Sequence, residues 1–285
     1  MFELEYCDNP KKKFIKSSGL KYDDSIALKY EKACNVLDNY IYLIDMFRII
    51  ESCTDDLLNV EISNKEYWKV NKALLNYVNA VYSFKEFTNN FNPSIKSITE
   101  NFYNNCKWYR FVCDFRNSVI HDSVISTDYG INDAYIIIDK LIDIQKHRTV
   151  KSYQENNRKR QIQYLENMKA DAKYWDGKYF YGIKKICRYA SSEIKEMKEE
   201  VLLYSYNKSV TKKLEWLFSF LYKIDGKIKY VFIVNKEKGP NCIYEPNYTL
   251  ENFIIKIRDT LGETSEIYML LKKFFDKNEY IEFFG

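Results

Sequence analysis

The sequence has few of the residues that break secondary structure. Its 285 residues include only 8 glycines and 4 prolines. Sandwiches and barrels need many turns, so this scarcity argues against both and favours long helices with few connections. Hydrophobic residues make up 46% of the chain and its length suffices for two units with sizeable cores. We therefore predict a mostly α protein.

The sequence also lacks the patterns that are typical of metal-binding, disulfide-rich and membrane proteins. The 7 cysteines are odd in number and form no Cys-x-x-Cys pair, which argues against a zinc ribbon and a disulfide framework. Acidic residues such as Asp55 and Asp56 lack metal-site spacing. Residues 1–5 have neither the basic start nor the apolar core of a signal peptide, and no apolar run approaches the ~18 residues that span a bilayer. We expect a reduced, cytoplasmic protein with no cofactor, no metal and no membrane contact.

Charge and motifs narrow the function classes further. The net charge is only +4, from 44 basic and 40 acidic residues, so any nucleic-acid surface must be local. The aromatic content of 17% matches what an AT-rich coding sequence produces, and it is not evidence of base stacking. The chain contains no P-loop, dinucleotide fingerprint, H-E-x-x-H or G-x-S-x-G motif.

Apolar periodicity predicts a helical bundle over residues 23–150. Capping residues at Asp23–Ser25 precede a helix from 26 to about 52, in which apolar side chains recur at three- and four-residue steps. Three more helices are expected: one from Asn64 to before Asn89, one from Pro93 into the central motif, and one after Asn132–Asp133. Trp68 and Tyr82 belong to the apolar stripe that the first of these three is expected to bury. Short connections make the four helices a bundle. Residues 1–22 read as an irregular arm.

Residues 151–285 are predicted to form a helical accessory region with a small β element. Asp176–Gly177 interrupts the helical pattern. Residues 229–234 are the clearest strand of the chain, and Gly239–Pro240 turns it back towards residues 242–244 as a short β-hairpin.

The central motif, Asp114–Asp122, places side chains capable of catalysis at the end of the third predicted helix. It holds Arg116, Asn117 and His121, one of only two histidines. An imidazole with a pKa near ~6.5 exchanges protons at neutral pH, and a guanidinium binds phosphate while staying charged. The combination suits phosphodiester chemistry, although a helix-terminal histidine often only caps the last carbonyls.

The motif's geometry on a regular helix separates its two key residues. Arg110, Asp114, Asn117 and His121 share one face opposite an apolar stripe, whereas Arg116 lies roughly 140° from His121. Three arrangements would bring them together: the helix unwinds before His121, Arg116 reaches round on its long stem, or groups from two helices or two subunits combine. The plainer interpretation of the polar stripe is a solvated face with an Arg110–Asp114 ion pair.

A basic segment follows at residues 146–160, with six Lys or Arg against one Glu. Charge runs are usually solvated faces, but this one is also a candidate phosphate-binding surface. His147 within it is interpreted as a surface residue. The candidate RNA-binding residues are Arg110, Lys146, Arg148, Lys151, Arg158, Lys159 and Arg160.

Phe115–His121, at the end of a helix in an α-bundle, resembles the signature of HEPN domains: an arginine, a polar residue beside it, and a histidine four to six residues on. The resemblance covers about residues 20–150. It implies a helical bundle that often dimerises and so brings two motifs together. Many members are metal-independent endoribonucleases in toxin–antitoxin, abortive-infection and other antiviral systems, and others bind RNA or nucleotides without catalysis.

The resulting expectation is a homodimeric endoribonuclease that uses the RNA 2′-hydroxyl as nucleophile. His121 would act as general base or acid, Arg116 would stabilise charge on the phosphorane, and Asn117 would orient the imidazole or bind phosphate. RNA is the expected partner, with a possible antitoxin or other regulatory protein. The alternative is a non-catalytic helical module that binds RNA, a nucleotide or a partner protein.

Overall fold

In a computed structural model the chain forms two compact units, with boundaries inside its two long helices α1 (Asp24–Asn59) and α7 (Ile183–Ser205). We call residues 1–45 with 202–285 the sheet unit and residues 46–201 the helical unit. The structure describes residues 2–7, 16–22, 24–62, 66–91, 93–122, 127–129, 133–205, 212–217, 230–235, 243–244, 250–263, 265, 268–269 and 272.

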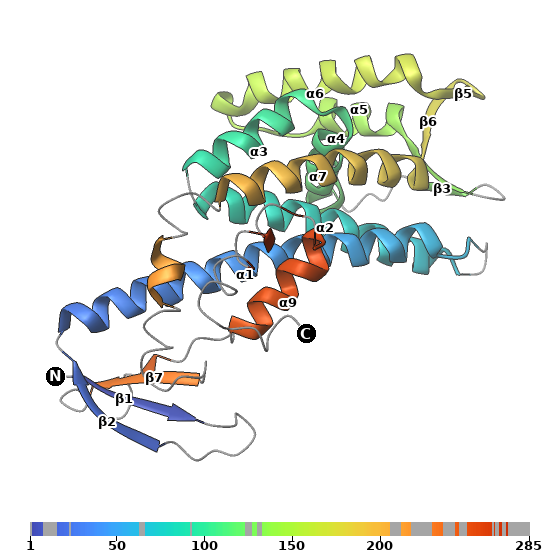
Figure 1. Ribbon diagram of the computed structural model, residues 1–285. Helices are drawn as coiled ribbons and strands as arrows, with labels where there is room; N and C mark the ends of the chain where they lie inside the picture. The colour runs from blue at the N-terminus through green and yellow to red at the C-terminus, as the bar shows by residue number, and fades with distance from the viewer. Residues whose placement is uncertain are drawn as a thin grey trace. The chain divides into compact units, whose positions relative to one another are not determined.

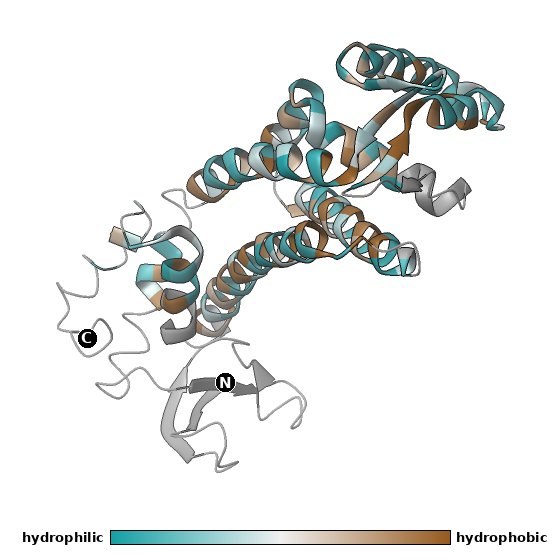
Figure 2. Ribbon diagram, turned by 90° about the vertical axis from the view of Figure 1, so that its right-hand side faces the viewer, coloured by the Kyte–Doolittle hydropathy of each residue, from teal (hydrophilic) through white to brown (hydrophobic). Residues whose placement is uncertain are grey.

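The protein is mostly helical, which confirms the predicted fold class. Figure 2 shows hydrophilic and hydrophobic residues alternating along the long helices, as expected of amphipathic helices with one buried face. Among the described residues, no helix is both long and apolar enough to span a bilayer. Further helices are α2 (Tyr67–Phe91), α3 (Pro93–Asn105), α4 (Lys107–Asp122), α5 (Ile138–His147), α6 (Glu155–Met168) and α9 (Leu250–Leu261), and residues 212–217 are also helical. Short 3-10 turns are η1 (Ser152–Gln154) and η2 (Lys169–Asp171).

The sheet unit contains a four-stranded antiparallel sheet in the order β2-β1-β7-β8. The hairpin of β7 (Tyr230–Asn235) and β8 (Ile243–Tyr244) confirms the predicted one. The irregular arm expected for residues 1–22 is wrong, because β1 (Phe2–Cys7) and β2 (Lys16–Tyr22) are strands there. β1 pairs with β7, more than two hundred residues away, and such a long-range pairing leaves little local signal.

The helical part of the sheet unit packs on the first half of α1. Tyr30, Leu37 and Ile41 are buried, as the apolar periodicity predicts. The Tyr40 hydroxyl donates to the Leu202 carbonyl at 3.1 Å. Lys256 of α9 forms an ion pair with Asp45 at 2.5 Å, which ties α9 to α1.

In the helical unit, α2 packs against both α3 and α4, and α5 packs against α6 (Figure 1). Phe47 of α1 lies against Phe84 of α2, with ring centroids 4.6 Å apart. The single helix predicted from Pro93 into the motif is divided at Cys106. The division is slight, because the Cys106 amide still donates to the Phe102 carbonyl at 2.7 Å.

A second antiparallel sheet, in the order β3-β4-β6-β5, belongs to the helical unit. Its strands are β3 (Thr127–Tyr129), β4 (Ala134–Ile137), β5 (Lys173–Trp175) and β6 (Lys178–Gly182). Two predictions are corrected here: β4 replaces the first turn of the fourth predicted helix, and β5 with β6 replaces a helical break. A short apolar run such as Ala134–Ile138 fits a strand as well as a helix by periodicity alone. The unit also continues past the predicted boundary at residue 150, because β4 pairs with β6 across it.

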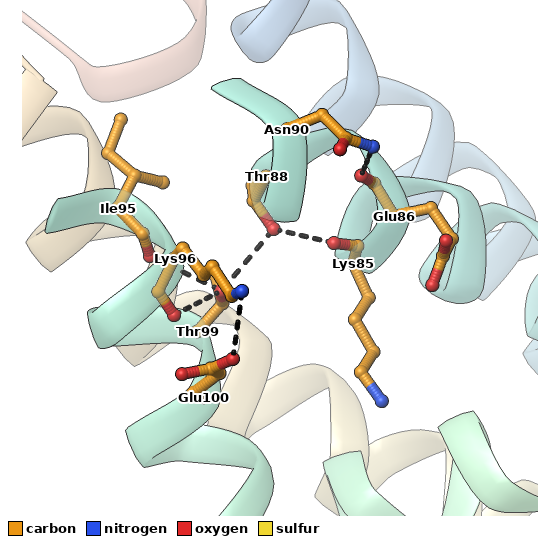
Figure 3. A network of polar contacts seen from close by, with 8 residues as sticks. All are labelled: Lys85, Glu86, Thr88, Asn90, Ile95, Lys96, Thr99 and Glu100. Atoms are coloured by element: carbon orange, nitrogen blue, oxygen red, sulfur yellow. Dashed lines mark hydrogen bonds and ion pairs between the residues drawn. The ribbon is translucent and has the colours of Figure 1, made fainter. Parts of the chain in front are cut away.

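Buried hydroxyls join α2 to α3, the pair of helices on which α4 packs (Figure 3). Thr88 and Thr99 are almost fully buried. The Thr88 hydroxyl shares its one proton between the Lys85 carbonyl at 2.9 Å and the Thr99 hydroxyl at 3.4 Å. Thr99 donates to the Lys96 carbonyl at 3.0 Å. Buried polar groups that are all hydrogen-bonded fix one arrangement of the two helices.

Candidate functional site

The start of α4, which carries the motif, is held by α7. Glu193 accepts hydrogen bonds from the backbone amides of Trp108 at 2.9 Å and Tyr109 at 2.6 Å. A carboxylate in this position satisfies amides that have no partner inside the helix and complements the helix dipole. Trp108 also stacks on Tyr189 of α7, with ring centroids 5.3 Å apart. The direction of α4 is therefore set from its first turn.

The apolar face of α4 is buried as predicted. Phe111, Val112 and Phe115 are each at most 3% exposed. Phe111 and Phe115 stack one turn apart with ring centroids 5.8 Å apart. This face fixes the rotation of α4 about its axis, and so the direction in which Arg110, Asp114 and Arg116 project.

The predicted Arg110–Asp114 ion pair exists, with Arg110 Nε 3.6 Å from Asp114 Oδ2. The solvated face predicted for it is wrong, since the two side chains are only 24% and 14% exposed. Arg110 lies over the ring of Tyr164 from α6, with Cζ 4.3 Å from the ring centroid. The Tyr103 hydroxyl donates to Asp114 Oδ1 at 2.5 Å. These neighbours come from α3 and α6, so no local sequence pattern predicts their contacts with α4.

Burial is the largest influence on the pKa of Asp114. It raises the pKa of this carboxyl above the usual aspartate range, although the Tyr103 hydroxyl, Arg110 and Lys85 favour the carboxylate and lower it. Lys85 itself lies over the Tyr103 ring, with Nζ 3.6 Å from the centroid. Beside Asp114 is a cavity with room for about one water molecule, lined also by Gln145, Gln161 and Tyr164.

Arg116 is half-buried and lies over an aromatic ring of α2. Its Cζ is 4.1 Å from the centroid of the Tyr82 ring. Burial raises the pKa of the Tyr82 hydroxyl and neighbouring Glu86 raises it further, while Arg116 lowers it. A planar guanidinium stacks well on an aromatic face and retains donors at its edge. The sequence suggests Tyr82 only as part of an apolar stripe, so its contact with Arg116 went unpredicted.

The backbone of α4 stays helical through the whole motif, to Asp122. The side chains of Asn117 and His121 lie outside the described residues. A regular helix places His121 roughly 140° around the axis and ~7.5 Å along it from Arg116. Unwinding before His121, the first of the three predicted arrangements, is therefore wrong. A long arginine stem, or a combination of groups from two helices or two subunits, remains.

The basic segment divides into exposed and engaged residues. Lys146, Lys151, Lys159 and Arg160 are exposed, and Arg148 is half-buried. Arg158 donates to the Lys146 carbonyl at 3.0 Å and to Glu155 at 2.6 Å, so it holds α6 against the end of α5. Of the seven candidate RNA-binding residues, Arg110 and Arg158 thus make structural contacts within the chain.

His147 is exposed, as predicted. Its Nδ1 donates to the Asp143 carbonyl at 2.9 Å and lies 3.2 Å from the Asp143 carboxylate. This acidic neighbour lies one helical turn earlier, outside the basic segment 146–160. His147 is therefore a solvent-facing helix-end residue.

Among the described residues, no group of three or more His, Cys, Asp or Glu side chains is arranged to hold a metal ion. Comparison with protein-family models, curated proteins and solved structures finds no match for this chain. The candidate site is accordingly defined by α4 and the aromatic residues packed around it.

Proposed function

We propose that the protein is a metal-independent endoribonuclease of the HEPN type, with Arg116, Asn117 and His121 as its catalytic residues. The observation that carries this proposal is the setting of Arg116. Its guanidinium rests on Tyr82, on a helix that continues without a break through Asn117 and His121. A guanidinium oriented in this way is suited to meet a phosphate with little loss of side-chain entropy.

The active form is a homodimer in which two α4 helices meet near a two-fold axis. Within one copy, Arg116 and His121 project in directions roughly 140° apart. An isologous interface brings each residue close to its counterpart, so Arg116 of one copy complements His121 of the other. The unbroken helix supports this arrangement over one built from a single motif.

The reaction is attack of an RNA 2′-hydroxyl on the adjacent phosphate. One His121 takes the 2′-hydroxyl proton while the bond from 2′-oxygen to phosphorus forms and the bond from phosphorus to the 5′-oxygen breaks. The leaving 5′-oxygen receives a proton from the second His121 of the dimer. Arg116 stabilises the charge on the phosphorane and Asn117 orients the imidazole or binds phosphate. The products are a 2′,3′-cyclic phosphate and a 5′-hydroxyl.

Exposed cations of the basic segment, Lys146, Lys151, Lys159 and Arg160, are proposed to contact RNA phosphates. Arg148 is a lesser candidate because it is half-buried. The role would be that of a toxin or an antiviral effector, restrained by an antitoxin or another regulatory protein.

A second candidate function is a non-catalytic RNA- or nucleotide-binding or protein-interaction module. The half-burial of Arg116 favours it, because the face of the guanidinium on Tyr82 is closed to a ligand. In this reading Arg116 contacts a phosphate only with its outer edge, and His121 serves to end the helix.

The deciding experiment incubates the full-length protein with single-stranded RNA in excess chelator. Cleavage is expected to yield cyclic-phosphate and 5′-hydroxyl ends, and DNA of the same sequence is expected to stay intact because it lacks the nucleophile. His121→Ala should lower the rate by about 10²–10⁴-fold, the usual effect of removing a general acid or base.

The chain supplies its own control, because His147 is the only other histidine. It is exposed on α5, so His147→Ala should cleave RNA like the wild type. Intact RNA, or equal cleavage by His121→Ala, would overturn the nuclease proposal. Intact RNA together with salt-dependent retardation in a gel would favour the binding module.

A further inference from the structure

A second surface of interest lies on the β5–β6 hairpin, near the end of α6 (Figure 1). The strands are joined by Asp176 and Gly177, both with positive φ, of 47° and 73°. Positive φ at both central residues characterises the tight two-residue turn that matches the natural twist of a hairpin. The ring pair of Tyr174 and Tyr179, with centroids 4.9 Å apart, holds the two strands together. The hairpin is therefore a preformed element.

Large aromatic side chains of this hairpin face solvent. Trp175 is 71% exposed and Tyr174 is 64% exposed. β5 is the edge strand of its sheet, paired only with β6 among the described strands. An exposed aromatic ring offers a flat face on which an unpaired nucleobase can stack.

Two lysines share the face of Trp175. Trp175 pairs with Lys178 across the hairpin, and directly opposed residues project from the same face of a sheet. Lys173 precedes Trp175 by two residues, so it projects from that face as well. Both lysines are exposed. The exposed tryptophan therefore shares one face of the sheet with two lysines.

Within the described part of the chain, the charges of Lys173 and Lys178 are not neutralised by a carboxylate. Among the described residues, no carboxylate lies within ion-pair distance of Lys173 or Lys178, whereas nearby Lys169 pairs with Asp139 and Glu166. The only acidic residue in the hairpin sequence is Asp176, in the turn. Lys173 Nζ lies 5.7 Å from the centroid of the Tyr135 ring, another aromatic group of the same sheet.

We propose that the β5–β6 hairpin binds single-stranded nucleic acid, with a base stacked on Trp175 and phosphates held by Lys173 and Lys178. Aromatic rings flanked by cations are the usual means of holding unpaired bases without sequence preference. A protein partner fits less well, because lysine is depleted at protein–protein interfaces. The surface does not depend on cleavage at α4, so it stands whether or not the protein is a nuclease.

Fluorescence anisotropy with a labelled short oligouridine tests this proposal. A 2′-O-methyl backbone prevents cleavage by 2′-hydroxyl attack and so separates binding from the chemistry proposed for α4. Trp175→Ala should weaken binding about 5- to 150-fold, the range measured for loss of one base–aromatic stack, and Trp175→Phe should restore most of it. A single-stranded DNA probe should bind similarly, because the hairpin would contact only the base and the phosphate, which DNA and RNA share.

Trp68 on α2 is the matched control. It is also an exposed tryptophan, at 56%, but its neighbour Lys69 is paired with Glu66 at 2.7 Å. Trp68→Ala should therefore bind the oligouridine like the wild type. Replacing Lys173 and Lys178 by alanine should reduce the slope of log affinity against log salt by about 0.7 for each lysine.

Unchanged affinity of Trp175→Ala would overturn the proposal, provided circular dichroism shows the variant folded. Equal weakening by Trp68→Ala would do the same, since any exposed tryptophan would then suffice. Light scattering distinguishes a protein contact: if Trp175→Ala dissociates an oligomer without changing oligonucleotide affinity, the hairpin is an interface between copies of the chain and the proposal fails.

Discussion

The two arginines of α4 lie six residues apart, and their surroundings differ. Both lie over a tyrosine ring, Arg110 over Tyr164 and Arg116 over Tyr82. Arg110 also has Asp114 one turn along the helix, 3.6 Å away. The positions one turn from Arg116 on α4 are Val112 and Ile120, so the helix itself places no carboxylate beside it. An aromatic support is thus common to a structural and a proposed catalytic arginine, and the helix-borne carboxylate distinguishes them.

Replacing each arginine by alanine should separate the two roles most strongly. Arg116→Ala is expected to lower RNA cleavage by about 10²–10³-fold, as for loss of one group that stabilises transition-state charge. Arg110→Ala should retain cleavage near the wild-type rate at temperatures where it is folded. Single-turnover rates of the two folded variants provide the measurement. Equal losses of cleavage rate in the two variants would show that Arg110 and Arg116 do not have separate roles.

Removal of Asp114 should affect stability more than any other change around Arg110. Asp114→Ala leaves Arg110 mostly buried without its carboxylate and the Tyr103 hydroxyl without its acceptor. The free energy of unfolding should fall by roughly 2–4 kcal/mol. Urea denaturation measures it, with Asp143→Ala as control because that carboxylate is exposed. If Asp114→Ala lowers the free energy of unfolding no more than Asp143→Ala does, the Arg110–Asp114 pair is effectively solvated.

The aromatic support of Arg116 should have a smaller effect. Tyr82→Leu removes the ring under the guanidinium, whereas Tyr82→Phe keeps it. A contact of this kind contributes about 0.5–2 kcal/mol, so Tyr82→Leu should slow cleavage roughly 2- to 30-fold. Tyr82→Phe should cleave normally. Parallel unfolding curves check that the loss lies in activity, and a full rate for Tyr82→Leu would remove the positioning role.

The smallest expected effect is a pH dependence that originates at Asp114. Burial raises the pKa of Asp114 in the folded protein, so the folded state binds this proton more tightly than the unfolded state. Its contribution to stability is present at low pH and is lost as pH rises from the unfolded value near ~3.9 through the raised pKa. Unfolding free energies of wild type and Asp114→Asn, compared across that range, test the sign. The wild type should lose stability relative to Asp114→Asn as pH rises, and the opposite trend would mean that Arg110 outweighs burial.

Local pattern was enough to predict the long helices. Tyr30, Leu37 and Phe47 recur at helical spacing and are all buried along α1. The apolar face of α4 follows the same rule, because the period of a helix is a property of neighbouring residues. The rule also fails in one place: Trp68, assigned to the buried stripe of α2, is 56% exposed. A stripe ends where the partner helix ends, and that length is not encoded locally.

Strands were harder to predict than helices. β4 looks like part of a helix because its apolar run continues into α5, and its strand geometry is stabilised by pairing with β6, more than forty residues later. β1 likewise depends on β7. A short strand acquires its hydrogen bonds only from a distant partner, so its own residues say little.

The order of residues alone specified a mostly helical chain, the amphipathic faces of α1 and α4, and the arginine and histidine that suggest RNA chemistry. Only the tertiary structure decided that Arg110 makes contacts within the chain, that Arg116 rests on Tyr82, and that Trp175 shares a sheet face with two lysines. The reason is physical: periodicity arises from adjacent residues, whereas burial and ring contacts arise from side chains that meet only after α2, α3, α6 and a sheet have packed around α4.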